Sequence, residues 1–147
     1  MPTADPIQTV LDTNVLVAAR RSQRGASSKL LRLHQEGDPR WEVNVSVPLV
    51  LEYESVLKRE EHRMGGNPAQ IEAAIDSFVA RANRRFIYFR WRPFLTDADD
   101  EFIIELALAS RQAIIVTHNT GNFSRCESLG IRVISPREFL NFQETVS

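Results

Sequence analysis

The chain has 147 residues, of which 43% are hydrophobic and 25% are charged, as expected for one ordinary globular domain with its own core. A formal net charge of −1 excludes a strongly basic nucleic-acid-binding protein, and the single cysteine, Cys126, excludes an internal disulfide. No apolar run reaches the roughly 18 residues needed to cross a membrane, and MPTADPIQ lacks signal-peptide features, so we expect a cytoplasmic protein.

Short apolar runs rich in Val and Ile predict buried strands of a parallel sheet. The four runs are Ile7–Leu11, Trp41–Val47, Ala113–Thr117 and Ile131–Ile134. Phe86–Arg90 is a fifth candidate, in which apolar and polar residues alternate less clearly.

Helical spacing of apolar residues occupies the segments between these runs. The first predicted helix is Ser27–Glu36, and Gly37 ends it. A second begins at Pro48, a residue that suits a first helical turn, and runs to about Arg63. Its Leu51 and Val56 are predicted to face the core.

Two further helices and a terminal one complete the pattern. Asn67-Pro68 opens a helix after the turn Gly65-Gly66, and its apolar stripe consists of Ile71, Ala74, Ile75 and Phe78. The next is marked by Phe102, Ile103, Leu106 and Ala107. Ser135 to Glu138 forms a capping box that starts the terminal helix. Strands alternating with helices predict an α/β domain with a mostly parallel sheet, in which ligands bind beyond the carboxyl ends of the strands.

Polar residues stand at two such strand ends. Asp12 directly follows Leu11, where capping of a helix and chemistry are equally plausible roles for a carboxylate. Asn119 stands in the matching position after Thr117, with Asn122 three residues on, and taken alone these two asparagines favour a turn.

Further acids lie at helices. Glu52 and Glu54 are two residues apart on one helix, so one of them should point inward and the other to solvent. Asp100 begins another helix beside Asp97 and Asp99, and three acids in four residues exceed what the helix dipole requires.

The acids from separate elements can converge on one crevice at the sheet edge. Carboxylate and amide oxygens of this kind suit Mg²⁺ or Mn²⁺ better than zinc. The histidines His34, His62 and His118 show no metal-ligand spacing, and no Gly-rich phosphate loop is present. Basic residues gather in two clusters, which alone favour solvated helix faces but would also suit a polyanion. The clusters are Arg20, Arg21, Arg24, Lys29, Arg32 and Arg40, then Arg81, Arg84, Arg85, Arg90 and Arg92.

At these residues the sequence resembles the PIN-domain family, especially the toxins of bacterial toxin–antitoxin pairs (VapC-like). Four motifs carry the resemblance in the family's order over about residues 7–140. They are Leu11 to Val17, Ser46 to Tyr53, Asp99 to Ala107, and Ile115 to Phe123.

The resemblance implies a single domain over residues 1–147, folded as a three-layer α/β/α sandwich. It also implies Mg²⁺- or Mn²⁺-dependent cleavage of single-stranded RNA, an antitoxin partner and a homodimer. The metal-binding and catalytic acids carry over to Asp12, Glu52 and Asp100, with Glu54 as the second choice at its motif and Asp97 and Asp99 as peripheral acids. The supporting residues are Asn14, Thr117, Asn119 and Asn122.

One departure from the family opens an alternative. Many members place an aspartate in the fourth motif, where this chain has Asn119 and Asn122. The alternative function is therefore a PIN-fold module that binds RNA or protein without cutting. A second alternative is a phosphate switch of the receiver type, which also has a carboxylate pocket on a parallel sheet. Such a switch needs a lysine near the end of the last strands, and Lys29 and Lys58 are not placed there. A metal-free ribonuclease would have to use His34, His62 or His118.

Overall fold

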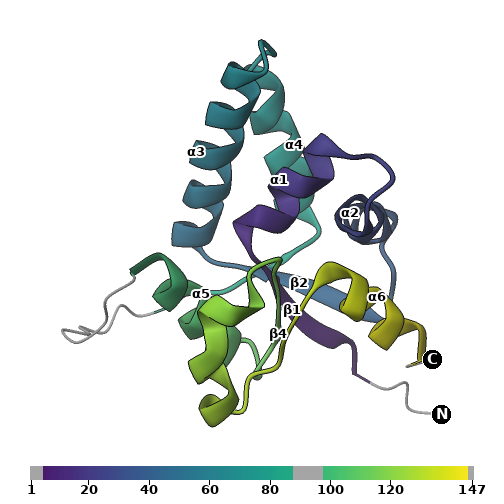
Figure 1. Ribbon diagram of the computed structural model, residues 1–147, viewed down its shortest axis with the longest axis vertical. Helices are drawn as coiled ribbons and strands as arrows, with labels where there is room; N and C mark the ends of the chain where they lie inside the picture. Colours follow the sequence, from purple (N-terminus) through teal and green to yellow (C-terminus); the bar gives the residue numbers. More distant parts are fainter. Residues whose placement is uncertain (1–4, 88–97, 146–147) are drawn as a thin grey trace.

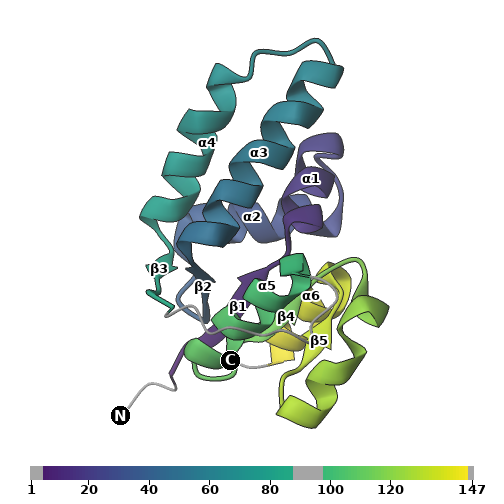
Figure 2. The ribbon, with the colours of Figure 1, turned by 90° about the vertical axis from the view of Figure 1, so that its left-hand side faces the viewer.

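The computed structural model describes residues 5–87 and 98–145, without the side chains of residues 98–100, 144 and 145. Its centre is a five-stranded sheet in the order β3-β2-β1-β4-β5, in which every pair is parallel (Figures 1 and 2). The strands are β1 (Ile7–Leu11), β2 (Trp41–Val45), β3 (Asn83–Arg84), β4 (Ile114–Val116) and β5 (Val133–Ile134).

Helices cover both faces of the sheet, as the right-handed connection of parallel strands requires (Figure 1). The first layer consists of α1 (Thr13–Arg21), α2 (Ala26–Glu36), α3 (Val47–Arg63), α4 (Ala69–Ala80) and α6 (Pro136–Thr145). The second consists of α5 (Ala98–Ala109), which packs on β1, β2 and β4, and the 3₁₀ segment η1 (Thr120–Leu129). The predicted three-layer α/β/α architecture is thus confirmed.

The strand order reverses between β1 and β4. From β1 the chain builds outward through β2 to β3, then returns to add β4 and β5 on the other side. Leu11 pairs with Val116, so the two central strands end side by side. This reversal is the place where parallel α/β sheets bind their ligands.

The strand predictions hold at the centre of the sheet and at the β5 edge, where Ile131–Ile134 is found shortened to Val133–Ile134, and fail at the β3 edge. Ile7–Leu11 is confirmed, whereas the second strand ends at Val45, two residues early, because Ser46 caps α3 and accepts a bond from the Leu49 amide. The candidate Phe86–Arg90 is wrong as far as it is described: the edge strand is the polar pair Asn83–Arg84, and residues 88–90 lie outside the described residues.

Most helix predictions are confirmed, and the local signals act as expected. Gly37 ends α2 in the left-handed conformation (φ 77°), which a side chain disfavours. Ser135 and Glu138 exchange the two hydrogen bonds of a capping box, each 3.2 Å long. The segments α1 and η1 were not predicted, since neither carries a long apolar stripe.

The inward face predicted for the helix after Pro48 is wrong at Leu51. That side chain is 60% exposed, because α3 turns Leu49, Tyr53 and Leu57 to the core at a spacing of four residues. In α4 the predicted stripe holds for Ile71, Ile75 and Phe78, whereas Ala74 is exposed.

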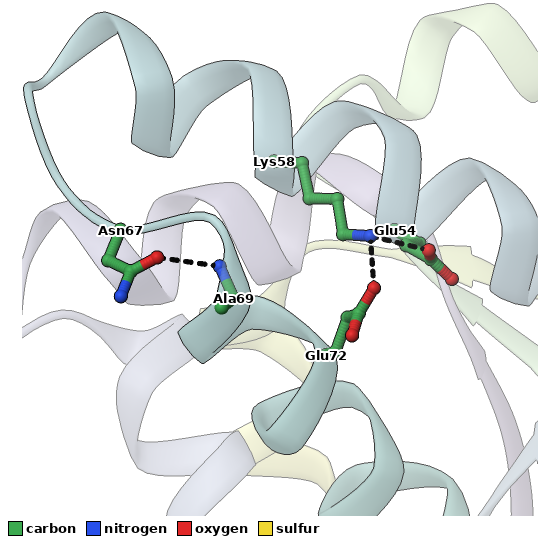
Figure 3. Close-up of polar contacts among 5 residues, drawn as sticks. All are labelled: Glu54, Lys58, Asn67, Ala69 and Glu72. Carbon is green, nitrogen blue, oxygen red and sulfur yellow. Dashed lines mark hydrogen bonds and ion pairs between the residues drawn. The ribbon is translucent and has the colours of Figure 1, made fainter.

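Helices α3 and α4 form an antiparallel pair whose connecting turn lies far from the sheet (Figures 1 and 2). Lys58 on α3 donates to both Glu54 and Glu72 at 2.7 Å, and Asn67 accepts from the Ala69 amide to start α4 (Figure 3). The turn predicted at Gly65-Gly66 is therefore confirmed. Within the described ranges, no helix is both long and apolar enough to span a membrane.

Candidate active site

Asp12 lies at the junction of β1 and α1, beyond the carboxyl end of the central strand. Its backbone amide donates to the Val116 carbonyl at 3.0 Å, which fixes it beside the end of β4. Its carboxylate accepts from the Thr13 amide at 2.8 Å and caps α1. Capping and a position in the crevice therefore coexist in one residue, because each uses a different carboxylate oxygen.

The second oxygen of Asp12 faces β4. It accepts from the Thr117 hydroxyl at 2.8 Å and from the Asn14 amide at 3.4 Å. Asn14 also donates to Thr117 at 3.1 Å and accepts from the His118 backbone amide at 3.1 Å. The backbone amide of Asn119 donates to the Thr117 hydroxyl at 3.0 Å. The ends of β1 and β4 are thus joined by a closed network that orients Asp12.

Glu52 reaches the same strand ends from α3, and the cluster of Asp12, Thr13, Glu52 and Thr117 is called the crevice. The Thr13 hydroxyl donates to its carboxylate, so Asp12 and Glu52 are linked through one intervening residue. The next residue, Tyr53, is buried and donates to the Leu11 carbonyl, which fixes α3 to the end of β1. Glu54 binds Lys58 on the other side of α3. The open choice between Glu52 and Glu54 therefore has a geometric answer: only Glu52 reaches this network.

The electrostatics of the crevice are dominated by burial. Desolvation raises the pKa of Asp12, although hydrogen bonds from Thr117 and the Thr13 amide, and then nearby His118, oppose the rise. Burial chiefly, and then the charges of Asp12 and Glu52, hold the pKa of Tyr53 well above its ordinary value. Negative charge in this crevice is therefore costly without a compensating cation.

The donor set suits a hard divalent cation. Carboxylate oxygens of Asp12 and Glu52 are of the type that binds Mg²⁺ or Mn²⁺. Asp12 makes no ion pair with Lys, Arg or His within the described part of the chain, so its partners there are hydroxyl and amide groups. The same residues include no cluster of three His, Cys, Asp or Glu side chains that would complete a metal site alone.

The remaining predicted site residues fall into two groups. Asn119 and Asn122 lie at the start of η1 with exposed side chains, and the backbone amide of Asn122 donates to the backbone carbonyl of Asn119 at 3.0 Å in a turn. Asp100 belongs to the first turn of α5, but its side chain and that of Asp99 lie outside the described residues, as does all of Asp97.

Thr13 and Tyr53 take part in the site although sequence reasoning did not select them. Thr13 stands between Asp12 and Asn14, so a search of every polar residue after the first strand would have found it. Tyr53 gave no comparable signal, because an aromatic residue on a helix usually belongs to the core.

Residues 8–121 match the PIN domain family. The chain belongs to the PIN domain family. The match covers Asp12, Glu52, Thr117 and Asn119 and ends one residue before Asn122.

This PIN domain is also similar to a solved chain. That chain comes from the crystal structure of VapBC2 from Rickettsia felis bound to a DNA fragment from the VapBC2 promoter. The two chains superpose with a TM-score of 0.61 over 88% of this chain and 98% of that chain. The two sequences are 16% identical, so the likeness is one of fold. No curated protein sequence matches this PIN domain.

Proposed function

We propose that this PIN domain is a metal-dependent endoribonuclease that hydrolyses phosphodiester bonds of single-stranded RNA. The observation that supports it most is the meeting of Asp12 and Glu52, from β1 and α3, at the point where the strand order reverses. Family membership supports nuclease activity, since PIN domains are generally nucleases.

Asp12 and Glu52 are the described residues that would hold a Mg²⁺ or Mn²⁺ ion. When bound, the cation lowers the pKa of a water molecule and neutralises charge on the phosphoryl oxygens. Thr13, Thr117 and Asn14 hold the two carboxylates in place through the hydrogen bonds described above. Partial burial reduces the hydration of Asp12, which strengthens its attraction for a cation.

Asp100 is the third acid of the proposal, with Asp97 and Asp99 as peripheral acids. The packing of α5 on β1 and β4, the strands that end in the crevice, supports this role. Asn119 and Asn122 are proposed as supporting residues at the rim of the crevice.

Cleavage of a labelled single-stranded RNA, with and without Mn²⁺, tests the proposal. We expect cleavage that a chelator abolishes and that Asp100→Asn removes while the circular dichroism spectrum is unchanged. Cleavage that persists in the chelator would instead favour a metal-free mechanism based on His118 or another histidine.

The non-catalytic RNA- or protein-binding module is the second candidate, and the exposed amides of Asn119 and Asn122 favour it. An amide adds no negative charge for a cation, so Asn119→Asp or Asn122→Asp should tighten Mn²⁺ binding. We expect about a tenfold gain, which needs only about 1.4 kcal/mol. Calorimetric titration of both variants, beside cleavage at limiting metal, measures it; unchanged affinity in both would place these residues outside the metal site.

We also propose that the protein acts as the toxin of a toxin–antitoxin pair, with an antitoxin partner and a homodimeric state. The fold it shares with a chain of VapBC2 supports this role. Expression of the wild type should arrest growth, and co-expression of a small neighbouring gene product should restore it. Growth arrest by a Glu52→Gln variant would contradict a nuclease toxin.

A further inference from the structure

An apolar surface stands open beside the crevice. Val47, Leu51 and Phe86 are 63%, 60% and 89% exposed, although large apolar side chains are usually buried. They surround a hollow of about 260 Å³. Its other lining residues are Val45, Ser46, Val50, Val79, Arg84 and Arg85.

This surface lies at the same edge of the sheet as the acids. Val47 and Leu51 follow the carboxyl end of β2 on α3, and Phe86 follows β3, which pairs in parallel with β2 (Figure 2). Asp12 follows β1, the next strand. Neighbouring strands are about 4.8 Å apart, so β3 stands roughly 10 Å from β1. A chain extended along this edge can touch both.

The surface is positively charged where it is polar. Arg84 is exposed and Arg85 is half-buried, with its Nε donating to Asn44 at 2.9 Å. No aspartate or glutamate is among the described residues that line the hollow. A two-fold contact between two copies centred here would bring the arginines of both copies together, which is unfavourable. A polyanion with flat apolar faces fits both properties.

We propose that this surface, the Phe86 platform (Val47, Leu51, Arg84, Arg85 and Phe86), binds one nucleobase and an adjoining phosphate of single-stranded RNA next to the cleavage site. The inference rests on the proposed ribonuclease function and adds a position on the substrate to it. The base stacks on Phe86 against the aliphatic side chains of α3, and Arg84 contacts the phosphate. Such stacking tolerates every base, so the platform holds RNA without reading its sequence.

The stacking test measures the affinity for a fluorescent oligouridylate by fluorescence anisotropy. A chelator is present so that the RNA is bound and not cut. Phe86→Ala should weaken binding about tenfold, and Phe86→Trp should restore it with quenched indole emission. Met64→Ala is the matched control, because Met64 is 57% exposed in the distant α3–α4 turn. An oligonucleotide of abasic residues, with all phosphates and no bases, should bind the wild type and Phe86→Ala equally.

The phosphate test measures the dependence of affinity on salt. Arg84→Ala should lower the slope of log affinity against log salt by about 0.7, as loss of one contact to a single strand requires. Arg63→Ala is its control, since Arg63 is exposed at the far end of α3 and pairs with Glu60. An unchanged slope for Arg84→Ala would remove the phosphate contact from the proposal.

Three outcomes overturn the platform. If Phe86→Ala binds and cuts RNA as the wild type does, the platform fails while the ribonuclease stands. If Phe86→Ala instead dissociates a dimer in sedimentation and the resulting monomer keeps full affinity, the surface is an interface between copies. A wild type that neither binds nor cuts any single-stranded RNA refutes the ribonuclease and the platform together.

Discussion

The crevice and the α3–α4 pair hold carboxylates in opposite ways, as Asp12 in the crevice and Glu54 on α3 show. In the α3–α4 pair, Glu54 and Glu72 share Lys58 (Figure 3). Glu60 of α3 pairs with Arg21 of α1, so each of these three negative charges faces a positive one. In the crevice, the described partners of Asp12 are hydroxyl and amide groups, and Glu52 accepts from a hydroxyl.

The two arrangements of carboxylates have different physical consequences for the protein. Exposed ion pairs add little to stability, and salt screens them. A buried carboxylate held by neutral donors is oriented but not neutralised, and burial raises its pKa. The first arrangement fastens two helices together, whereas the second is suited to an added cation. Comparing charge compensation thus separates Asp12, which the described neutral donors orient, from Glu54, which Lys58 pairs.

The sharpest test of this comparison exchanges the two glutamates separately. Glu52→Gln should lower the rate of RNA cleavage more than about a hundredfold, beyond the usual cost of losing a group that only orients a ligand. Glu54→Gln removes the same charge from the same helix and should leave the rate nearly unchanged. Steady-state cleavage assays at saturating Mn²⁺ measure both. Equal losses in the two variants would show that the orientation of α3 does not decide the role.

The orienting network provides the next largest effect. Thr117→Val keeps the shape of this fully buried residue but removes the hydrogen bond to Asp12, and should cost about 10- to 100-fold in activity. Because that bond favours the charged form, its loss raises the pKa of Asp12 further, and the acid limb of the pH–rate profile should move to higher pH. Thr117→Ser should restore both. A profile unmoved by Thr117→Val would contradict this role.

Thermal stability distinguishes the crevice from the ion pairs, because the crevice should respond to added metal and the ion pairs should not. A cation that binds only the folded state adds about 2.7 kcal/mol at a hundredfold excess over its Kd, so Mn²⁺ should raise the Tm of the wild type. Asp12→Asn, which still caps α1, should abolish that rise. Differential scanning fluorimetry measures both, with Glu54→Gln as the variant that keeps the response.

The pH dependence follows from the raised pKa of Asp12. The folded state binds a proton at Asp12 more tightly than the unfolded state does. Protonation of Asp12 therefore adds to the free energy of unfolding, and this contribution is complete below the ordinary pKa of aspartate. It is lost as pH rises through the folded value. Without metal, Asp12→Asn should therefore be at least as stable as the wild type at neutral pH. The difference in stability between the variant and the wild type should shrink as the pH is lowered towards the ordinary pKa of aspartate. A difference that grows on acidification would mean that the pKa of Asp12 is lowered and not raised.

The smallest expected effect belongs to the ion pairs. Lys58→Met leaves Glu54 and Glu72 without their shared lysine but exposes no apolar core, so the Tm should fall slightly at low salt and not at all at high salt. Cleavage should be unaffected. Thermal melts at two ionic strengths measure this, and a large loss that persists at high salt would mean that the pair is more than a surface contact.

Local chemistry made much of the fold predictable from the sequence. The apolar run Ile7–Leu11, the stop at Gly37 and the capping box from Ser135 to Glu138 are signals that can be read from neighbouring residues, and each is found as predicted. The edge strand Asn83–Arg84 was missed because two polar residues carry no apolar pattern, and they pair only because β2 is already in place.

The sequence alone placed Asp12 at a strand end and put Glu52 and Glu54 on opposite sides of one helix. Which glutamate faces the crevice was decided by tertiary structure, because it depends on how α3 docks against β1 through Tyr53. The exposure of Leu51 and Phe86 has the same origin: periodicity gives the relative directions of side chains along an element, whereas the packing of distant elements determines which direction is covered.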